Sequence, residues 1–171
     1  MKYNEIPQLT KWGNWECCYS LDSFVETIAK WEREDGLEMN PRFQRGHVWT
    51  EEQQIRFVEF VLRGGNTGKV IYLNHPGWMS SFIAGKAGFV CVDGLQRTTA
   101  IQRFVNNEIP AFGTYHNDFE GSTRLQHEMR INVNNLQTEK EVLTWYLEMN
   151  EGGTPHTESE LQKVRNMLKE A

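Results

Sequence analysis

The sequence predicts an α+β fold, in which a small mixed sheet is packed by several helices. Three observations support this prediction. Apolar residues recur at helical spacing behind three capping-box patterns. Two apolar runs, 69–74 and 89–92, are too short for helices, and residues 129–136 alternate between apolar and polar side chains. Because helices outnumber short strands, a small sheet covered by helices is the expected architecture.

The first half of the chain contains two predicted helices and one predicted strand. Apolar side chains from Leu21 onward have helical spacing, with Ser20 or Asp22 as the N-cap and Asp35-Gly36 at the end. Thr50 opens a capping box. The elements expected here are a helix from Leu21 to the end marked by Asp35-Gly36, a helix at 51–63, a strand at 69–74, and a loop or irregular hairpin at 75–88.

The second half is predicted to alternate between strands and helices. The apolar run 89–92 stops at Asp93-Gly94, and apolar residues then repeat at helical spacing. Thr138 and Thr157 each open a further capping box. The elements expected here are a strand at 89–92, a helix at 95–106, short strands and turns at 108–123, a strand at 129–136, and helices after Thr138 and Thr157.

Length and composition limit the class of protein. A chain of 171 residues with 39% apolar side chains suits one core, so we expect a single domain over residues 1–171. No apolar run is long enough to span a membrane and no secretory signal is visible, which favours a cytoplasmic protein. The net charge of −5 argues against a broad DNA-binding face. The three cysteines lack metal-site spacing and are interpreted as small buried side chains.

The most informative segment is the junction at Asp93-Gly94, where a buried strand meets a helix. The first amides of that helix have no intrahelical partner and the helix dipole adds positive charge, so the junction attracts an anion such as phosphate. Gly94 lets a ligand approach the backbone, Arg97 and Thr98 supply a cation and a hydroxyl, and Asp93 can hold magnesium or orient a water. The alternative is structural: Asp93 caps the helix, Gly94 makes the turn and Arg97 is solvated.

Two further segments combine polar groups with irregular structure. In residues 40–49, Arg45 can reach a phosphate, and Phe43 or Trp49 can stack on a base. The alternative is that both aromatic side chains fill the core while the arginines are solvated. In the turn predicted at residues 150–155, Asn150 can present an amide to a ligand, although a helix end followed by a turn explains the same residues.

Together and in this order, the three segments resemble one family. It is the N-terminal domain of GmrSD-type modification-dependent restriction systems, which is related to the ParB/sulfiredoxin-like fold. The resemblance runs from about residue 20 to residue 168 and implies a ParB-like arrangement of the predicted sheet and helices. The matching motifs are Gln44-Arg45 followed by Trp49, Asp93-Gly94-Leu95-Gln96-Arg97-Thr98-Thr99, and Asn150 followed by Gly153-Thr154-Pro155.

The resemblance implies a nucleotide site. The family's activity would be magnesium-assisted binding and hydrolysis of a nucleoside triphosphate, which controls recognition or cleavage of DNA. By resemblance, the hydrolysis motif is Asp93, Gln96 and Arg97, with Mg²⁺ at Asp93. The implied nucleotide-binding residues are Arg45, Gly94, Arg97, Thr98 and Asn150, and the implied DNA-facing residues are Phe43, Gln44 and Trp49.

Departures from the family pattern leave three functions open. Leu95 stands where the family commonly has glutamine, so turnover is expected to be slow or absent if that glutamine aids hydrolysis. No histidine has a metal-nuclease spacing, so the C-terminal HNH nuclease domain of larger relatives is not expected here. The open functions are an NTP-hydrolysing domain of a restriction or defence system, a non-enzymatic DNA-binding adaptor, regulator or phage-encoded decoy, and a ParB-like nuclease. The expected partners are a nucleoside triphosphate, DNA, and a separate nuclease or host restriction protein.

Overall fold

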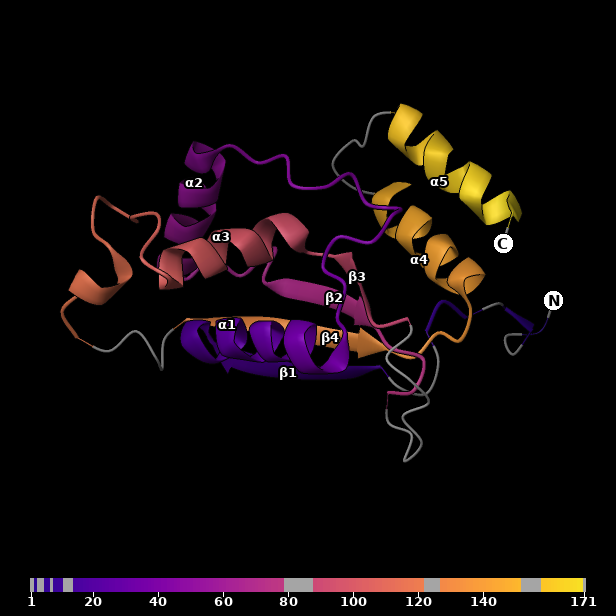
Figure 1. The fold of residues 1–171 in the computed structure, drawn as a ribbon, viewed down its shortest axis with the longest axis horizontal. Coiled ribbons are helices and arrows are strands. Elements are labelled where there is room, and N and C mark those ends of the chain that lie inside the picture. Colours follow the sequence, from indigo (N-terminus) through magenta and orange to yellow (C-terminus); the bar gives the residue numbers. More distant parts are fainter. Residues whose placement is uncertain are drawn as a thin grey trace.

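The fold is built on a four-stranded mixed sheet (Figure 1). The computed structural model describes residues 2, 5–6, 8–10, 14–78, 88–121, 127–151 and 158–170. The strand β4 runs antiparallel to β1 and parallel to β2, and β2 runs antiparallel to β3. The strands are β1 (Trp15–Ser20), β2 (Val70–Asn74), β3 (Val90–Asp93) and β4 (Glu128–Asn134), in the order β1-β4-β2-β3.

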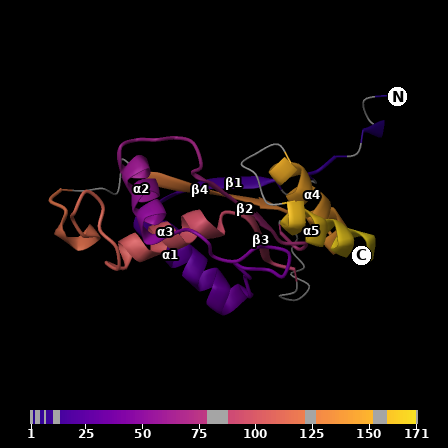
Figure 2. The same cartoon turned by 90° about the horizontal axis from the view of Figure 1, so that it is seen from above.

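The helices of the described residues pack on this sheet in two groups. Successive side chains of a strand point to opposite faces. Here Ile71 and Leu73 of β2 join the core under α1, α2 and α3, whereas Tyr72 packs against the core under α4 and α5. The α4–α5 pair lies at the end of the molecule away from α2 in both views (Figure 1 and Figure 2). The helices are α1 (Leu21–Lys30), α2 (Glu51–Leu62), α3 (Leu95–Val105), α4 (Glu139–Glu151) and α5 (Glu158–Glu170), with a π-helical turn η2 (Trp31–Asp35) and a 3₁₀ turn η3 (His116–Asp118).

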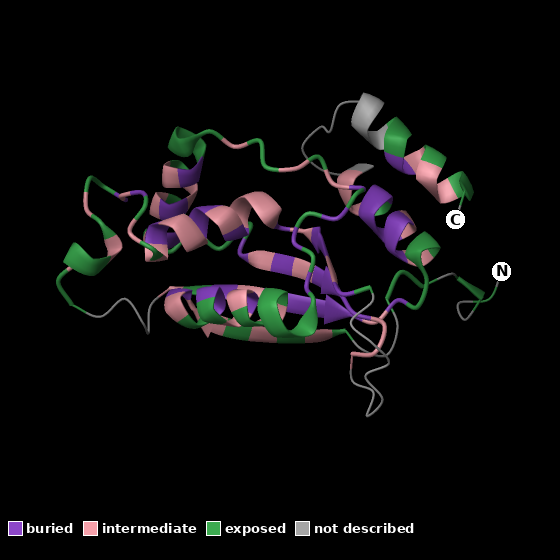
Figure 3. Ribbon diagram, viewed as in Figure 1, coloured by how far each residue is buried: buried purple, intermediate pink, exposed green. Residues whose placement is uncertain are grey.

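Burial of apolar side chains holds these layers together. The buried residues follow the sides on which helices and strands face each other (Figure 3). Phe24 of α1, Phe104 of α3 and Ile131 of β4 are completely buried in the larger core. None of the described helices is long and apolar enough to cross a membrane. The α+β class predicted from the sequence is therefore confirmed.

Three predicted helix starts are confirmed by their caps. The Ser20 side chain accepts a hydrogen bond from an amide of the first turn of α1. Thr50 takes part in a reciprocal capping box at the start of α2. Thr138 and Glu141 bond to each other's amides at the start of α4. The capping box predicted at Thr157 lies outside the described residues.

Two segments differ from the prediction, and a third lies mostly outside the described residues. The edge strand β1 has no counterpart among the predicted elements. Cys18 of this strand is exposed and Cys17 is half-buried, so the interpretation of all three cysteines as buried holds for Cys91 and is wrong for Cys18. The strands expected within 108–123 reduce, over the described residues 108–121, to a single bridge and a 3₁₀ turn. Most of the loop predicted at 75–88 lies outside the described residues.

Residues 36–49, here called the edge segment, run in irregular conformation along β3. Glu38 forms a parallel bridge with Val90, and its backbone bonds to the residues on either side of that valine. The Gln44 side chain donates to the carbonyl oxygen of Cys91 at 2.7 Å. These contacts carry Arg45 and the residues after it to the start of α3.

Candidate functional site

A pocket of about 370 Å³ opens where the start of α3 faces the C-terminal half of α4. Its volume lies within the range of small-molecule sites. The edge segment and the end of β3 complete its wall. The pocket therefore brings together residues from the first two segments that the sequence singles out and Asn150 of the third, whose residues 153–155 lie outside the described part of the chain. It is lined by Gln44, Arg45, Trp49, Val92, Asp93, Gly94, Leu95, Gln96, Arg97, Tyr146, Met149 and Asn150.

The junction of β3 and α3 gives one end of the pocket its positive character. Gly94 is the N-cap of α3 and offers no side chain to the amides of the first turn. The helix start therefore directs partial positive charge into the pocket. The fold also requires glycine here: Gly94 has a φ of 138°, and a Cβ would lie 2.7 Å from two atoms of Ile71.

Two arginines line the pocket, and Arg45 is the one without a partner in the described part of the chain. Its side chain is exposed and forms neither a hydrogen bond nor an ion pair with the described residues. A free guanidinium offers five N–H donors in a planar fork that matches phosphate oxygens. Arg45 is therefore the group best placed to bind an anion in this pocket.

Arg97, in contrast, is held by the protein itself. One guanidinium nitrogen donates to the carbonyl oxygens of Gly68 at 2.8 Å and Val70 at 2.7 Å. The other pairs with Oδ2 of Asp93 at 2.6 Å, and the side chain is 15% exposed. The alternative of a solvated surface arginine is therefore wrong, and a phosphate would compete with three existing contacts for Arg97.

Asp93 keeps one carboxylate oxygen for a ligand. Its Oδ2 pairs with Arg97, whereas Oδ1 has no hydrogen-bond partner among the described residues. Within those residues, no three His, Cys, Asp or Glu side chains gather where they could hold a metal ion. Because Mg²⁺ is commonly bound by one or two carboxylates plus substrate phosphates, Asp93 fits a magnesium ion that arrives with a phosphate.

The Gln96 side chain is bonded at both ends to the backbone of the edge segment. Its Oε1 accepts from the amides of Val48 at 2.9 Å and Trp49 at 3.0 Å, and its Nε2 donates to the carbonyl oxygen of Gly46 at 2.7 Å. Both lone pairs of Oε1 are therefore used. Gln96 thus has no free oxygen lone pair with which to orient an attacking water.

The implied DNA-facing residues occupy three different environments. Phe43 is 5% exposed and packs edge-on against Tyr146 with a centroid distance of 5.2 Å. Such burial is incompatible with stacking on DNA, so the alternative that Phe43 fills the core fits the structure. Gln44 lines the pocket while bonded to β3. Trp49 is half-buried against Phe57 and keeps part of its surface in the pocket.

Of two further residues that the resemblance places at the nucleotide, one lines the pocket and the other does not. Thr98 is 1% exposed, its hydroxyl has no hydrogen-bond partner among the described residues, and it does not line the pocket. A direct contact between Thr98 and a ligand there is therefore incompatible with the fold. Asn150 lines the pocket and donates from Nδ2 to the carbonyl oxygen of Tyr146 at 2.7 Å, and its Oδ1 has no hydrogen-bond partner among the described residues.

A comparison with known protein families identifies the family to which the chain belongs. The family model described as "GmrSD restriction endonuclease, N-terminal domain" matches residues 26–130, more than half of the chain. The chain belongs to this family. Membership relates it to modification-dependent restriction systems. No curated protein and no solved structure matches the chain.

The GmrSD match covers only part of the pocket. It includes the edge segment, β3 and α3 but ends before α4. Tyr146 and Met149 of α4 line the pocket, and neither residue is among the site residues predicted from the sequence. Their spacing with Asn150 places all three on one side of a helix, and this was the signal that could have identified them.

The pocket is not suited to covalent catalysis by the cysteine next to it. Cys91 of β3 lies next to the pocket residue Val92 but is completely buried. Burial raises the pKa of the Cys91 thiol to about 12, so the side chain is a protonated thiol at neutral pH. Because the thiolate is the nucleophilic form, Cys91 is not suited to covalent catalysis.

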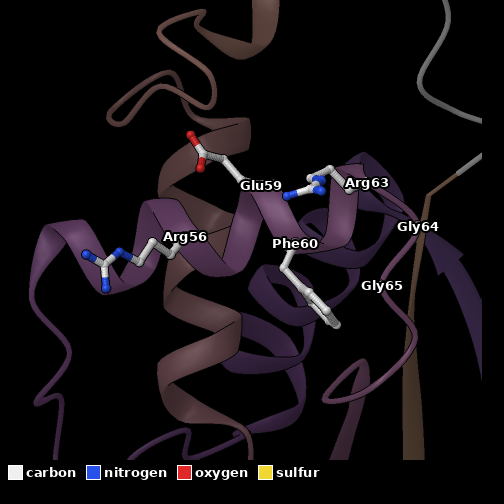
Figure 4. Close-up of a pocket in the computed structure, with 6 residues that line it drawn as sticks. All are labelled: Arg56, Glu59, Phe60, Arg63, Gly64 and Gly65. Atoms are coloured by element: carbon white, nitrogen blue, oxygen red, sulfur yellow. The ribbon is translucent and has the colours of Figure 1, made fainter.

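A larger hollow of about 510 Å³ on α2 is a weaker candidate site (Figure 4). The guanidinium groups of Arg56 and Arg63 lie apart in the close-up, so the two cations do not converge (Figure 4). Arg56 pairs with Glu52, and Glu59 accepts a hydrogen bond from a backbone amide. We therefore take the pocket at α3 as the site, because a free cation, a carboxylate and a helix start converge in it.

Proposed function

We propose that the chain binds a nucleoside triphosphate in the pocket at the start of α3, as the nucleotide-responsive domain of a restriction or defence system. One observation carries the proposal: the uncapped start of α3 lines the same cavity as Arg45, whose side chain has no partner among the described residues. Each of these features favours phosphate by itself. Their convergence from separate parts of the chain makes phosphate the best-matched ligand group.

The pocket has charged walls and an apolar wall, as the phosphates and the base of a nucleotide require. The walls formed by Asp93 of β3 and Arg45 of the edge segment are charged and suit the triphosphate. The wall formed by α4 carries Tyr146 and Met149, with the amide oxygen of Asn150, which has no partner in the described part of the chain, beside them. Apolar walls with a few placed polar groups are typical of sites that bind a heterocycle. We therefore place the base at the α4 wall.

Magnesium accompanies the triphosphate in this proposal. Asp93 would hold the ion through its free Oδ1, together with phosphate oxygens. Bound magnesium would neutralise phosphate charge, which is a large part of catalysis in phosphoryl transfer. Asp93 would also be the pocket's carboxylate available to orient a water. The magnesium-dependent hydrolysis implied by the family resemblance is thus proposed to depend on Asp93.

A second function, nucleotide binding without turnover, is favoured by the contacts of the residues beside Asp93. The oxygen of Gln96 and the guanidinium of Arg97 are engaged by the protein, and Leu95 is apolar. Fewer groups are therefore free to activate a water than the family resemblance implies. In this case the nucleotide-bound domain would act as an adaptor or regulator for DNA, a separate nuclease or a host restriction protein.

Arg45→Ala tests nucleotide binding. We expect titration calorimetry with the four ribonucleoside triphosphates and Mg²⁺ to show binding of at least one to the wild type. Arg45→Ala should weaken that affinity by about tenfold or more, because it removes a charge-assisted phosphate contact. The melting temperature should not change, since Arg45 has no bond to the described residues. Arg63→Ala, an exposed arginine on the other hollow, is the control, and equal affinity in wild type and Arg45→Ala would refute the proposal.

Phosphate release separates the two functions. Steady release that is lost in Asp93→Asn supports hydrolysis, because asparagine can still accept the bond from Arg97 but binds magnesium weakly. Binding without release supports the adaptor. A gel-shift titration with DNA, with and without nucleotide at several salt concentrations, then tests the partner, since phosphate contacts give a steep salt dependence.

A further inference from the structure

Arg45 lies between two hydrogen-bonded anchors on the β3–α3 unit. On one side, the Gln44 side chain donates to the Cys91 carbonyl oxygen at 2.7 Å. On the other, the Gly46 carbonyl oxygen accepts from Nε2 of Gln96, also at 2.7 Å. Both chain neighbours of Arg45 are therefore fixed relative to the start of α3. The reach of the guanidinium into the pocket depends on these anchors.

Gln96 is the stronger of the two anchors, because one amide satisfies three backbone groups. Besides Gly46, it bonds to the amides of Val48 and Trp49. The edge segment has no helix or sheet ladder here that would fix it independently. Among the described residues, no other side chain of α3 is hydrogen-bonded to the edge segment. Without Gln96, the residues on the C-terminal side of Arg45 lose their hydrogen bonds to α3, and the Gln44–Cys91 bond is the remaining anchor next to Arg45.

We propose that Gln96 is a positioning residue, which acts on the nucleotide through Arg45 by holding the edge segment against α3. This inference rests on the proposed function and deepens it. The role needs an amide, because the side chain must accept two hydrogen bonds and donate one. It differs from the hydrolytic role that the family resemblance implies for Gln96, since the side chain contacts the protein backbone and not the reacting group.

A double-mutant cycle tests this role. Gln96→Met keeps the length of the side chain and removes all three hydrogen bonds. We expect it to weaken triphosphate affinity by about tenfold, and to have a much smaller effect in the Arg45→Ala background, because residues that act through one another are not additive. Gln102→Met on the same helix is the matched control and should leave affinity unchanged. Additive effects of the two substitutions would overturn the proposal.

Amide exchange gives a readout that needs no nucleotide. In Gln96→Met, the amides of Val48 and Trp49 should exchange faster than in wild type, whereas Gln102→Met should leave them unchanged. If Gln96→Met does not fold, Gln96→Ala also removes the three hydrogen bonds without adding a charge to the pocket, and its effect on affinity should again depend on Arg45.

The possible failures can be told apart. Absence of triphosphate binding by the wild type would overturn the proposed function together with this inference. Faster exchange at Val48 and Trp49 with unchanged affinity would overturn only the positioning role. Reduced turnover at unchanged affinity, equal in both Arg45 backgrounds, would restore a catalytic role for Gln96.

Discussion

Residues at the β3–α3 junction serve the fold before they serve a ligand. Gly94 is required by its backbone angle and by the closeness of Ile71, and Arg97 is bonded to the backbone before β2. Arg45 has no such structural partner among the described residues. The difference decides which substitutions test function and which test stability. A substitution of Arg45 therefore tests ligand binding, whereas substitutions of Gly94 and Arg97 mainly test the stability of the fold.

Gly94→Ala should be strongly destabilising. The substitution adds a Cβ at a φ of 138° and places it 2.7 Å from Ile71. Backbone strain and overpacking together should lower the free energy of unfolding by about 2–5 kcal/mol. Gly64→Ala is the matched control, because Gly64 also has a positive φ of 81° but no atom within 4 Å of the added Cβ. Urea unfolding measures both, and similar losses at the two positions would contradict the role of Ile71.

At the scale of elements, the sequence predicts what local chemistry decides. Capping residues and apolar spacing are local signals, and the helices α2, α3 and α4 follow them closely. The edge strand β1 has a single neighbour, β4, and its formation depends on pairing with a distant segment. The position of the edge segment likewise depends on side chains of α3. Sequence reasoning therefore identified Gln96 but assigned it a chemical role and missed its structural one.

Arg97→Lys should show how α3 is tied to the start of β2. A lysine ammonium cannot reproduce the planar fork that contacts Gly68, Val70 and Asp93 together. Unsatisfied backbone carbonyls should lower the free energy of unfolding by about 1–3 kcal/mol. Arg56→Lys, at an exposed ion pair with Glu52, is the control and should cost at most about 0.5 kcal/mol. If thermal unfolding shows equal stability for both variants, the Arg97 hydrogen bonds contribute nothing to the free energy of unfolding.

At the scale of the whole molecule, the pocket lies between the two helix groups. One of its walls is the start of α3, which packs on the larger core, and another is α4, which packs on the smaller one. The pocket therefore forms only when both groups are docked on the sheet. This explains why sequence reasoning found the charged residues, which stand in local motifs, but not Tyr146 and Met149.

The pH dependence of stability should follow the buried histidine at the end of β2. His75 is 6% exposed, accepts a hydrogen bond at Nδ1 from the Gly77 amide at 3.0 Å, and packs edge-on against Phe89. Burial lowers the pKa of His75, so the folded protein holds this ring neutral. Below the ordinary pKa of about 6.5, the unfolded chain gains a proton that the folded protein does not. The free energy of unfolding should therefore fall as the pH drops from about 7 toward 5.

Replacing the ring tests this assignment. In His75→Gln, the fall in unfolding free energy between about pH 7 and pH 5 should be shallower than in wild type, because one of the groups that take up protons on unfolding is gone. Burial also lowers the pKa of His127, so part of the slope should remain. His47→Gln, at an exposed position, serves as the control. Denaturant titrations at several pH values measure the slope, and an identical slope in wild type and His75→Gln would show that the folded protein accommodates the charged His75 ring at no cost.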